Sequence, residues 1–169
     1  MTDNTSDLLT KLTELYDDQK LDEAEEICNK MLLEDENNTP ATYFKGLIED
    51  ERGNFAAAER HYRRILSVEP DAPHIPYVLA TNLLDQGKVE EAETFMDKLE
   101  EDETVDDYQL AEFRSLLALA KGDKEKALAI VDEAIEDADE EDVDDLNELR
   151  EIIESHKNSE EQPQNEETV

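Results

Sequence analysis

Apolar residues recur along the chain at the three- and four-residue spacing of amphipathic helices. One series runs from Leu8 to Leu15 and a second from Ala24 to Met31, and a polar stretch around Lys20 separates them. This spacing predicts a helix, a turn and a second helix. Similar pairs of helical segments follow, so the sequence predicts an all-α fold.

The helix-turn-helix unit repeats along the chain. Three turn glycines are each followed five residues later by an alanine: Gly53 by Ala58, Gly87 by Ala92, and Gly122 by Ala127. Ala24 precedes this series, and Gln19 stands in the place of its glycine. Glycine suits the end of a helix because it adopts the left-handed conformation without a side-chain clash. A period of 34 or 35 residues indicates a repeat fold.

These residues resemble the tetratricopeptide repeat family, whose unit is a helical hairpin with a Gly near the turn, an Ala in the second helix and a closing Pro. The unit at 39–72 fits best. It carries Gly46, Gly53, Phe55, Ala58, Tyr62, Ile65 and Pro70 at the family's places. The first unit departs from the pattern with Leu12, and the fourth with Ser115, where the family has a small residue or glycine in the first helix. The resemblance implies a right-handed superhelical α-solenoid of helix-turn-helix hairpins with a C-terminal capping helix.

We predict one domain over residues 1–156, with repeats at about 5–38, 39–72, 73–107 and 108–141. Pro40 and Pro73 stand where first helices are expected to begin. A capping helix at about 142–156 covers the last repeat, as repeat stacks require. Its expected buried face holds Val143, Leu146, Leu149, Ile152 and Ile153. Residues 157–169 are polar and acidic, which predicts a disordered tail.

The resemblance also implies that the first helix of each hairpin lines a concave groove. The groove positions are Leu9, Thr13, Tyr16, Tyr43, Leu47, Asp50, Tyr77, Thr81, Leu84 and Glu112. Tyrosine and leucine side chains suit an extended or helical peptide. The Lys, Asn and Arg side chains with which related co-chaperones grip a carboxylate are missing. We therefore expect a protein or peptide partner that is basic or neutral and has apolar anchors. The alternative is that these side chains pack between helices and the acids are solvated.

The charge is strongly negative, with 49 acidic and 16 basic residues and a formal net charge of −33. This balance opposes binding to nucleic acid or to an anionic membrane surface. Two interpretations remain: adaptation to a salt-rich cytoplasm, as in halophiles, or attraction of a basic ligand. We find no secretory signal and no membrane-spanning run, so we expect a cytoplasmic protein.

One basic cluster interrupts the acidic sequence. Arg60, Arg63 and Arg64 lie close to Arg52, and they form a candidate secondary contact patch for an acidic partner or a second copy. The alternative is that they pair with the protein's own acids.

Residue patterns for catalysis are missing. The sequence contains no Gly-rich phosphate loop, metal-binding Cys and His spacing, or nucleophile triad, and Cys28 lies among helix-spaced apolar residues. We therefore predict no enzyme activity, no cofactor and no metal. The leading hypothesis is a protein-interaction scaffold, an adaptor or assembly chaperone. The alternative is a structural protein that forms homo-oligomers through its end hairpins or the arginine patch.

Overall fold

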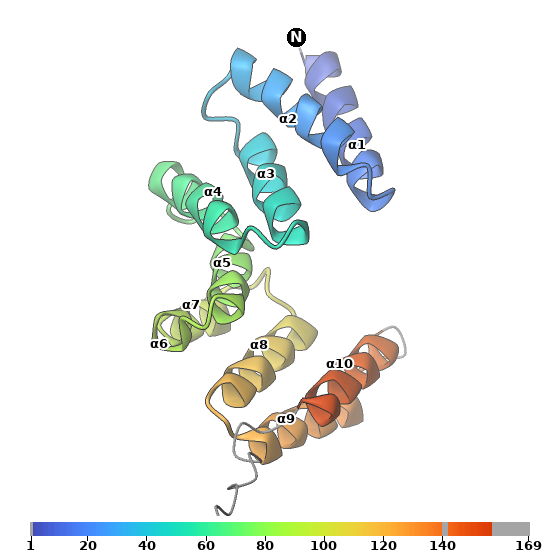
Figure 1. Cartoon of the computed structure of the whole chain (residues 1–169), viewed down its shortest axis with the longest axis vertical. Helices are drawn as coiled ribbons and strands as arrows, with labels where there is room; N and C mark the ends of the chain where they lie inside the picture. The colour runs from blue at the N-terminus through green and yellow to red at the C-terminus, as the bar shows by residue number, and fades with distance from the viewer. Residues whose placement is uncertain (1, 140–141, 157–169) are drawn as a thin grey trace, which may run out of the picture. The chain divides into compact units, whose positions relative to one another are not determined.

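The computed structural model describes residues 2–139 and 142–156, so the predicted tail at 157–169 lies outside the described residues. Within this part of the chain all regular structure is helical, which confirms the predicted all-α fold (Figure 1). The helices are α1 (Thr2–Asp17), α2 (Leu21–Glu34), α3 (Thr39–Glu51), α4 (Phe55–Val68), α5 (Ile75–Asp85), α6 (Val89–Glu93), α7 (Met96–Glu101), α8 (Asp107–Ala120), α9 (Lys124–Asp137) and α10 (Val143–Ser155).

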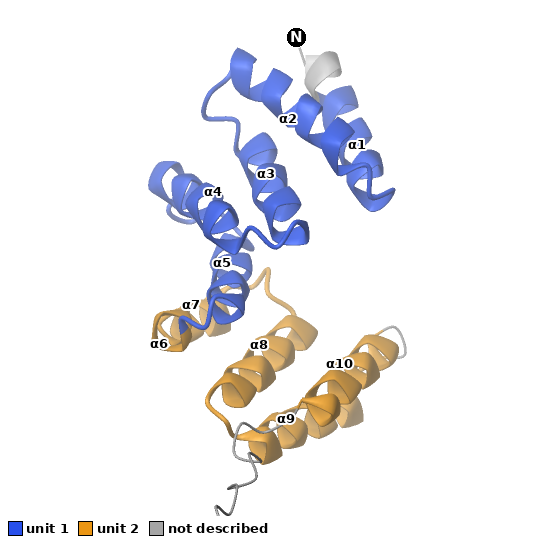
Figure 2. Ribbon diagram, in the orientation of Figure 1, with its two compact units in different colours: residues 1–88 blue, residues 89–169 orange. Residues whose placement is uncertain are grey.

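The chain forms two compact units, residues 1–88 and residues 89–169 (Figure 2). In unit 1, each of the helices α1 to α4 packs against the next one along the chain. In unit 2, α8, α9 and α10 pack against one another and α6 packs against α8. Unit 1 thus contains the hairpins α1–α2 and α3–α4, and unit 2 contains the hairpin α8–α9, as expected of an α-solenoid.

The four turns share one backbone geometry. Gly53, Gly87 and Gly122 have φ values of 72°, 69° and 82°, and Gln19 takes the same left-handed conformation with φ 58°. In each turn the following residue donates its N–H to a carbonyl five residues earlier. These bonds are Lys20 to Leu15, Asn54 to Glu49, Lys88 to Leu83 (each 2.8 Å) and Asp123 to Ala118 (2.9 Å). This pattern satisfies carbonyls at the helix end and reverses the chain. Gln19 therefore does stand in the glycine's place.

The helices of the second hairpin cross closely at Gly46 and Tyr62. A Cβ atom at Gly46 would lie 2.3 Å from Cε1 of Tyr62, well inside van der Waals contact. The Tyr62 side chain is fully buried. A glycine is required here because the tyrosine ring occupies the space of its side chain.

Side-chain caps mark several helix starts. Asn38 accepts a hydrogen bond from the Ala41 N–H at 2.9 Å, and Pro40 lies in the first turn of α3, as predicted. The prediction that Pro73 begins a helix is wrong by two residues. His74 takes a left-handed conformation with φ 60°, so α5 starts at Ile75.

The second helix of the third hairpin is broken. It is divided into α6 and α7, because Thr94 and Phe95 bond carbonyls only three residues back (both 3.1 Å). The Thr94 hydroxyl also donates to the Glu91 carbonyl at 2.7 Å. Such local bonding by threonine competes with the regular helical ladder. The apolar spacing predicts one continuous helix here and does not reveal this break.

The helix α10 closes the apolar core of unit 2. Leu146, Leu149 and Ile153 are buried in one cluster with residues of α8 and α9. Placing Ile152 on this buried face was wrong, because its side chain is 59% exposed. Adjacent helical residues point about 100° apart, so Ile152 and Ile153 do not share a face. Lys124 secures the helix end by donating to the carbonyls of Glu154 (2.6 Å) and His156 (2.8 Å).

Candidate functional site

Nine of the ten predicted groove residues lie in unit 1, on α1, α3 and α5, and Glu112 lies on α8 in unit 2. Thr13 is exposed, and most of the others are half-buried: Leu9, Tyr16, Tyr43, Leu47, Asp50, Thr81, Leu84 and Glu112. Tyr77 is the exception, because it exposes only 9% of its surface. Its equivalence to Tyr43 by repeat spacing therefore does not extend to exposure.

Aromatic side chains form a row across unit 1. Tyr16 contacts Phe44 edge to face with a ring-centroid distance of 5.7 Å, and Phe44 contacts Tyr43 at 5.9 Å. Tyr43 in turn lies 6.3 Å from the buried ring of Tyr62. We call Tyr16, Phe44 and Tyr43 the aromatic row. Our sequence prediction missed Phe44, although it directly follows Tyr43.

The Tyr16 hydroxyl is held by an acid of the next hairpin. It donates to Oε1 of Glu51 at 3.1 Å. Burial and then the nearby Glu51 carboxylate raise the pKa of Tyr16 above its usual value, which keeps the phenol neutral. Glu51, the last residue of α3, thus contributes to holding the aromatic row in place.

Asp50 is part of a buried polar network between α3, α4 and α5. Its carboxylate accepts hydrogen bonds from the Tyr62 hydroxyl and from the Asn82 amide, both at 2.5 Å. Burial raises the pKa of Asp50 against the opposing effect of these two hydrogen bonds. Asn82 also donates to the Phe55 carbonyl at 3.1 Å. Asp50 therefore links α3 to α4 through Tyr62 and to α5 through Asn82. Both of its carboxylate oxygens are used in these contacts.

A glutamate recurs at the contacts between successive hairpins. Glu25 accepts a hydrogen bond from Arg52 at 2.7 Å, and Glu59 accepts one from Gln86 at 3.0 Å. In unit 2, Glu93 pairs with Lys121. Each glutamate directly follows the alanine that recurs once in every hairpin, and each donor directly precedes a turn glycine. This contact thus repeats with the period of the hairpins, a signal that the sequence contained and our prediction missed.

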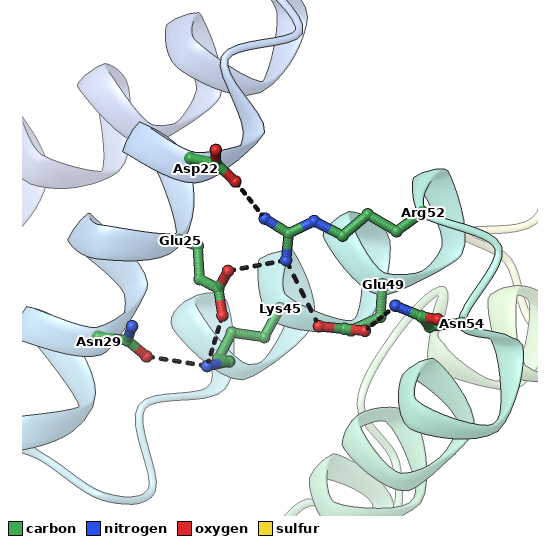
Figure 3. Close-up of polar contacts among 7 residues, drawn as sticks. All are labelled: Asp22, Glu25, Asn29, Lys45, Glu49, Arg52 and Asn54. Carbon is green, nitrogen blue, oxygen red and sulfur yellow. Dashed lines mark hydrogen bonds and ion pairs between the residues drawn. The ribbon is translucent and has the colours of Figure 1, made fainter.

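The contact between α2 and α3 is the most elaborate of the three (Figure 3). Arg52 lies between Asp22 and Glu25, at 2.7 Å from each carboxylate, and 3.6 Å from Glu49. Lys45 contacts the other oxygen of Glu25 at 3.4 Å. The hydrogen bond from Arg52 is the largest influence lowering the pKa of Glu25. Arg52 is therefore a residue of the hairpin contact and not a free cation.

The other arginines of the predicted patch differ among themselves. Arg63 pairs with Glu59 at 2.7 Å, as the alternative of internal pairing predicted. Arg60 donates to the Ala56 carbonyl (3.0 Å) and Arg64 to the Glu36 carbonyl (2.6 Å). Among the described residues, neither of these two cations lies within ion-pair distance of a carboxylate. The patch is thus partly neutralised.

Unit 2 contains a pocket of about 410 Å³ between α8, α9 and α10. Its lining residues are Asp107, Tyr108, Leu110, Ala111, Arg114, Ile130, Glu133, Ala134, Asp137, Ala138, Asp139, Asp142 and Leu146. The predicted groove residue Glu112 is not among them. In residues 2–139 and 142–156 we find no cluster of His, Cys, Asp or Glu able to hold a metal ion. Cys28 is buried, and its burial raises the thiol pKa to about 11.

Comparison with known proteins agrees with the hairpin architecture. The tetratricopeptide repeat family model matches residues 51–118. A tetratricopeptide repeat protein from Parabacteroides merdae superposes with a TM-score of 0.68 at 22% identity, and the match covers 87% of this chain and 56% of that one. A structure described as the MamA RS-1 ArsTM double mutant superposes with a TM-score of 0.65 at 13% identity, covering 91% of this chain and 96% of that one. No curated protein matches the sequence.

The helical hairpins therefore define a repeat scaffold of the kind that binds other proteins. The chain has the fold of tetratricopeptide repeat proteins, and residues 51–118 match the sequence model of that family. It spans little more than half the length of the Parabacteroides merdae protein. In the part of the chain that the structure describes, no helix combines the length and the apolar composition needed to cross a lipid bilayer.

Proposed function

We propose that this chain is a non-catalytic adaptor or assembly chaperone that binds a peptide or helix of a partner protein along the first helices of its hairpins. The ligand is basic or neutral and has apolar anchors. The domain that carries this activity spans residues 1–156. It acts in the cytoplasm, where its acidity is compatible with a salt-rich interior.

The aromatic row is the observation that supports this proposal best. Tyr16 and Tyr43 are half-buried on neighbouring helices, so each keeps part of its ring accessible. The Tyr43 hydroxyl makes no hydrogen bond to another described residue, and burial raises its pKa, so it stays a neutral donor. Half-buried tyrosines that are already ordered bind a ligand at low cost in side-chain entropy. Leu47 lies one helical turn from Tyr43 and adds apolar surface.

The test compares partner capture by the intact chain with capture by a double variant, Tyr43→Ala with Leu47→Ala. We expect partners identified by mass spectrometry to be lost from the variant. The matched control is Leu33→Ala with Ile152→Ala, since both side chains are exposed and lie outside the predicted groove. Circular dichroism establishes that both variants remain folded. Retention of every partner by the folded Tyr43 and Leu47 variant would disprove the groove assignment.

Self-association is the second candidate function. Arg60, Arg64 and Val68 are exposed and lie four residues apart on α4, so they share one helix face. This face supports contact with an acidic surface of a second copy. Light scattering at several salt concentrations tests it, with Arg60→Gln and Arg64→Gln expected to dissociate any oligomer. A wild-type chain that is monomeric at all concentrations rules this candidate out.

A further inference from the structure

The pocket of unit 2 has a mixed lining of apolar and charged residues. Leu110, Ala111, Ile130, Ala134 and Leu146 contribute to its lining from three different helices. Its volume of about 410 Å³ falls within the range of sites that hold small ligands or a few side chains of a peptide. The pocket is separate from the aromatic row, which lies in unit 1.

Five carboxylates also line the pocket: Asp107, Glu133, Asp137, Asp139 and Asp142. Among the residues that the structure describes, none of the five lies within ion-pair distance of a cation. Arg114 is the single basic lining residue, and it pairs with Glu100 at 2.7 Å. The lining thus has a net negative charge, and no cation of the described residues neutralises it.

The pKa of Tyr108, another lining residue, is raised by its surroundings. Burial is the largest influence on its phenol, and the neighbouring carboxylates of Glu112, Asp145, Asp106 and Asp142 act in the same direction. Together they raise the pKa of Tyr108 to about 12. A raised phenol pKa is the expected effect of nearby anions, so it supports a negative potential at the pocket.

Charge decides which occupant fits. Residues 157–169 contain four Glu and one Lys, so this segment of the chain is repelled by the pocket. A second copy carries a net charge of −33 and is repelled as a whole. A basic segment of another protein is attracted, and an apolar side chain within it fits the lining.

We propose that the pocket between α8, α9 and α10 binds a short segment of a partner protein in which apolar residues are flanked by Lys or Arg. The apolar side chain enters between Ile130 and Leu146 and leaves water. The flanking ammonium or guanidinium groups pair with Glu133, Asp137 and Asp142 at the rim. Charge-assisted hydrogen bonds to these carboxylates orient the segment.

The probe is a fluorescein-labelled peptide of sequence Lys-Arg-Leu-Leu-Arg-Lys, titrated with the full chain and followed by anisotropy. Two matched peptides replace the leucines by serine or the basic residues by glutamate. We expect the serine peptide to bind about tenfold more weakly, because a leucine side chain no longer enters the pocket, and the glutamate peptide not to bind. Equal binding of the leucine and serine peptides would overturn the proposal.

Two charge variants separate pocket binding from general attraction. Glu133→Gln, Asp137→Asn and Asp142→Asn together neutralise the rim, whereas Glu125→Gln, Glu136→Gln and Glu148→Gln remove the same charge from exposed residues of α9 and α10 outside the lining. We expect about a tenfold loss of affinity in the rim variant and less than a twofold loss in the control. Equal losses would show general attraction only and would reject the pocket.

A third pair of variants keeps the test independent of charge. Ala134→Phe fills the pocket, and Ala129→Phe places the same side chain on an exposed face of α9. We expect only the first to abolish binding. If instead Tyr43→Ala with Leu47→Ala abolishes binding, the peptide occupies the aromatic row, and the pocket proposal fails while the proposed function stands. Light scattering that shows an oligomer broken by the rim variant would identify a second copy as the occupant and also reject the proposal.

Discussion

The hairpins α1–α2 and α3–α4 have equivalent helix crossings, but the large side chain at the crossing comes from a different helix in each. In α3–α4 the first helix supplies Gly46 and the second supplies the large ring of Tyr62. One repeat earlier, in α1–α2, the corresponding residues are Leu12 and Cys28, both fully buried in one apolar cluster. The bulk therefore moves from the second helix to the first while the crossing stays filled. A departure from the family pattern at one position is offset at its partner.

The largest expected effect comes from exchanging this pair. Tyr62→Cys removes a buried ring and its hydrogen bond to Asp50, and we expect it to destabilise the chain by about 3 kcal/mol. Gly46→Leu forces a side chain into the ring and costs a similar amount. The double variant reproduces the Leu12 and Cys28 arrangement. Its cost, measured by urea unfolding, is expected to be about 2 kcal/mol less than the sum of the single costs. Simple additivity would show that the two crossings are not equivalent.

The glutamates at the hairpin contacts predict how the stability of the fold depends on pH. Burial acts to raise the pKa of Glu59, but hydrogen bonds from Lys88, Arg63 and Gln86 outweigh it and lower the pKa to about 2. Because this folded pKa lies below the ordinary value, Glu59 stabilises the fold above about pH 4.5 and loses that contribution as pH falls towards 2. We expect Glu59→Gln to cost about 2 kcal/mol at pH 6 and to flatten the acid side of the stability profile.

The control for this prediction is Glu26→Gln, since Glu26 is exposed on α2. Unfolding free energies are measured between pH 6 and pH 3 for the wild type and both variants. An unchanged slope in Glu59→Gln would mean that its three donors do not hold it as described.

The turns offer a smaller test. Gln19 in the first hairpin and Gly53 in the second have the same left-handed backbone, which disfavours a side chain. We expect Gln19→Gly to stabilise the chain by about 1 kcal/mol and Gly53→Gln to destabilise it by about the same amount. Thermal melting measures both. The same sign of change for the two variants would show that the turns are not alike.

The smallest effect is expected at the hairpin contact of Arg52. Arg52→Gln gives this contact the residue found at the next one, Gln86, and removes its charge. We expect a loss of about 0.5 kcal/mol, because Asp22 is almost fully exposed and such pairs contribute little. Salt screens the pair, so the difference in melting temperature from the wild type narrows between low and high salt. A difference that is independent of salt would assign the loss to packing of the arginine stem.

The repeat itself could be predicted because its signals are local. A glycine at a left-handed turn and an alanine at a close crossing recur at one spacing, and even the substitution by Gln19 could be placed. The succession of helical hairpins followed from the same period. The family resemblance extended this to the fold, which the structure confirms.

Exposure and polar contacts were not predictable in the same way. Tyr77 occupies the place of Tyr43 in the repeat but is almost buried, because exposure depends on the neighbours that pack around each helix. The pocket forms where three helices meet, and the helical period of one segment does not reveal it. The recurring contacts of Glu25, Glu59 and Glu93 were visible as a period, but their partners lie 27 or 28 residues away in the next hairpin.

Reciprocal filling of the crossings limits how such a chain can diversify by duplication. A duplication that copies a whole hairpin carries both members of the pair and keeps the crossing filled. Recombination within hairpins would join α1 to α4 and set Leu12 against Tyr62, or join α3 to α2 and leave Gly46 beside Cys28 with a cavity. We therefore expect junctions for viable chimeras of this protein to lie in the segments between hairpins.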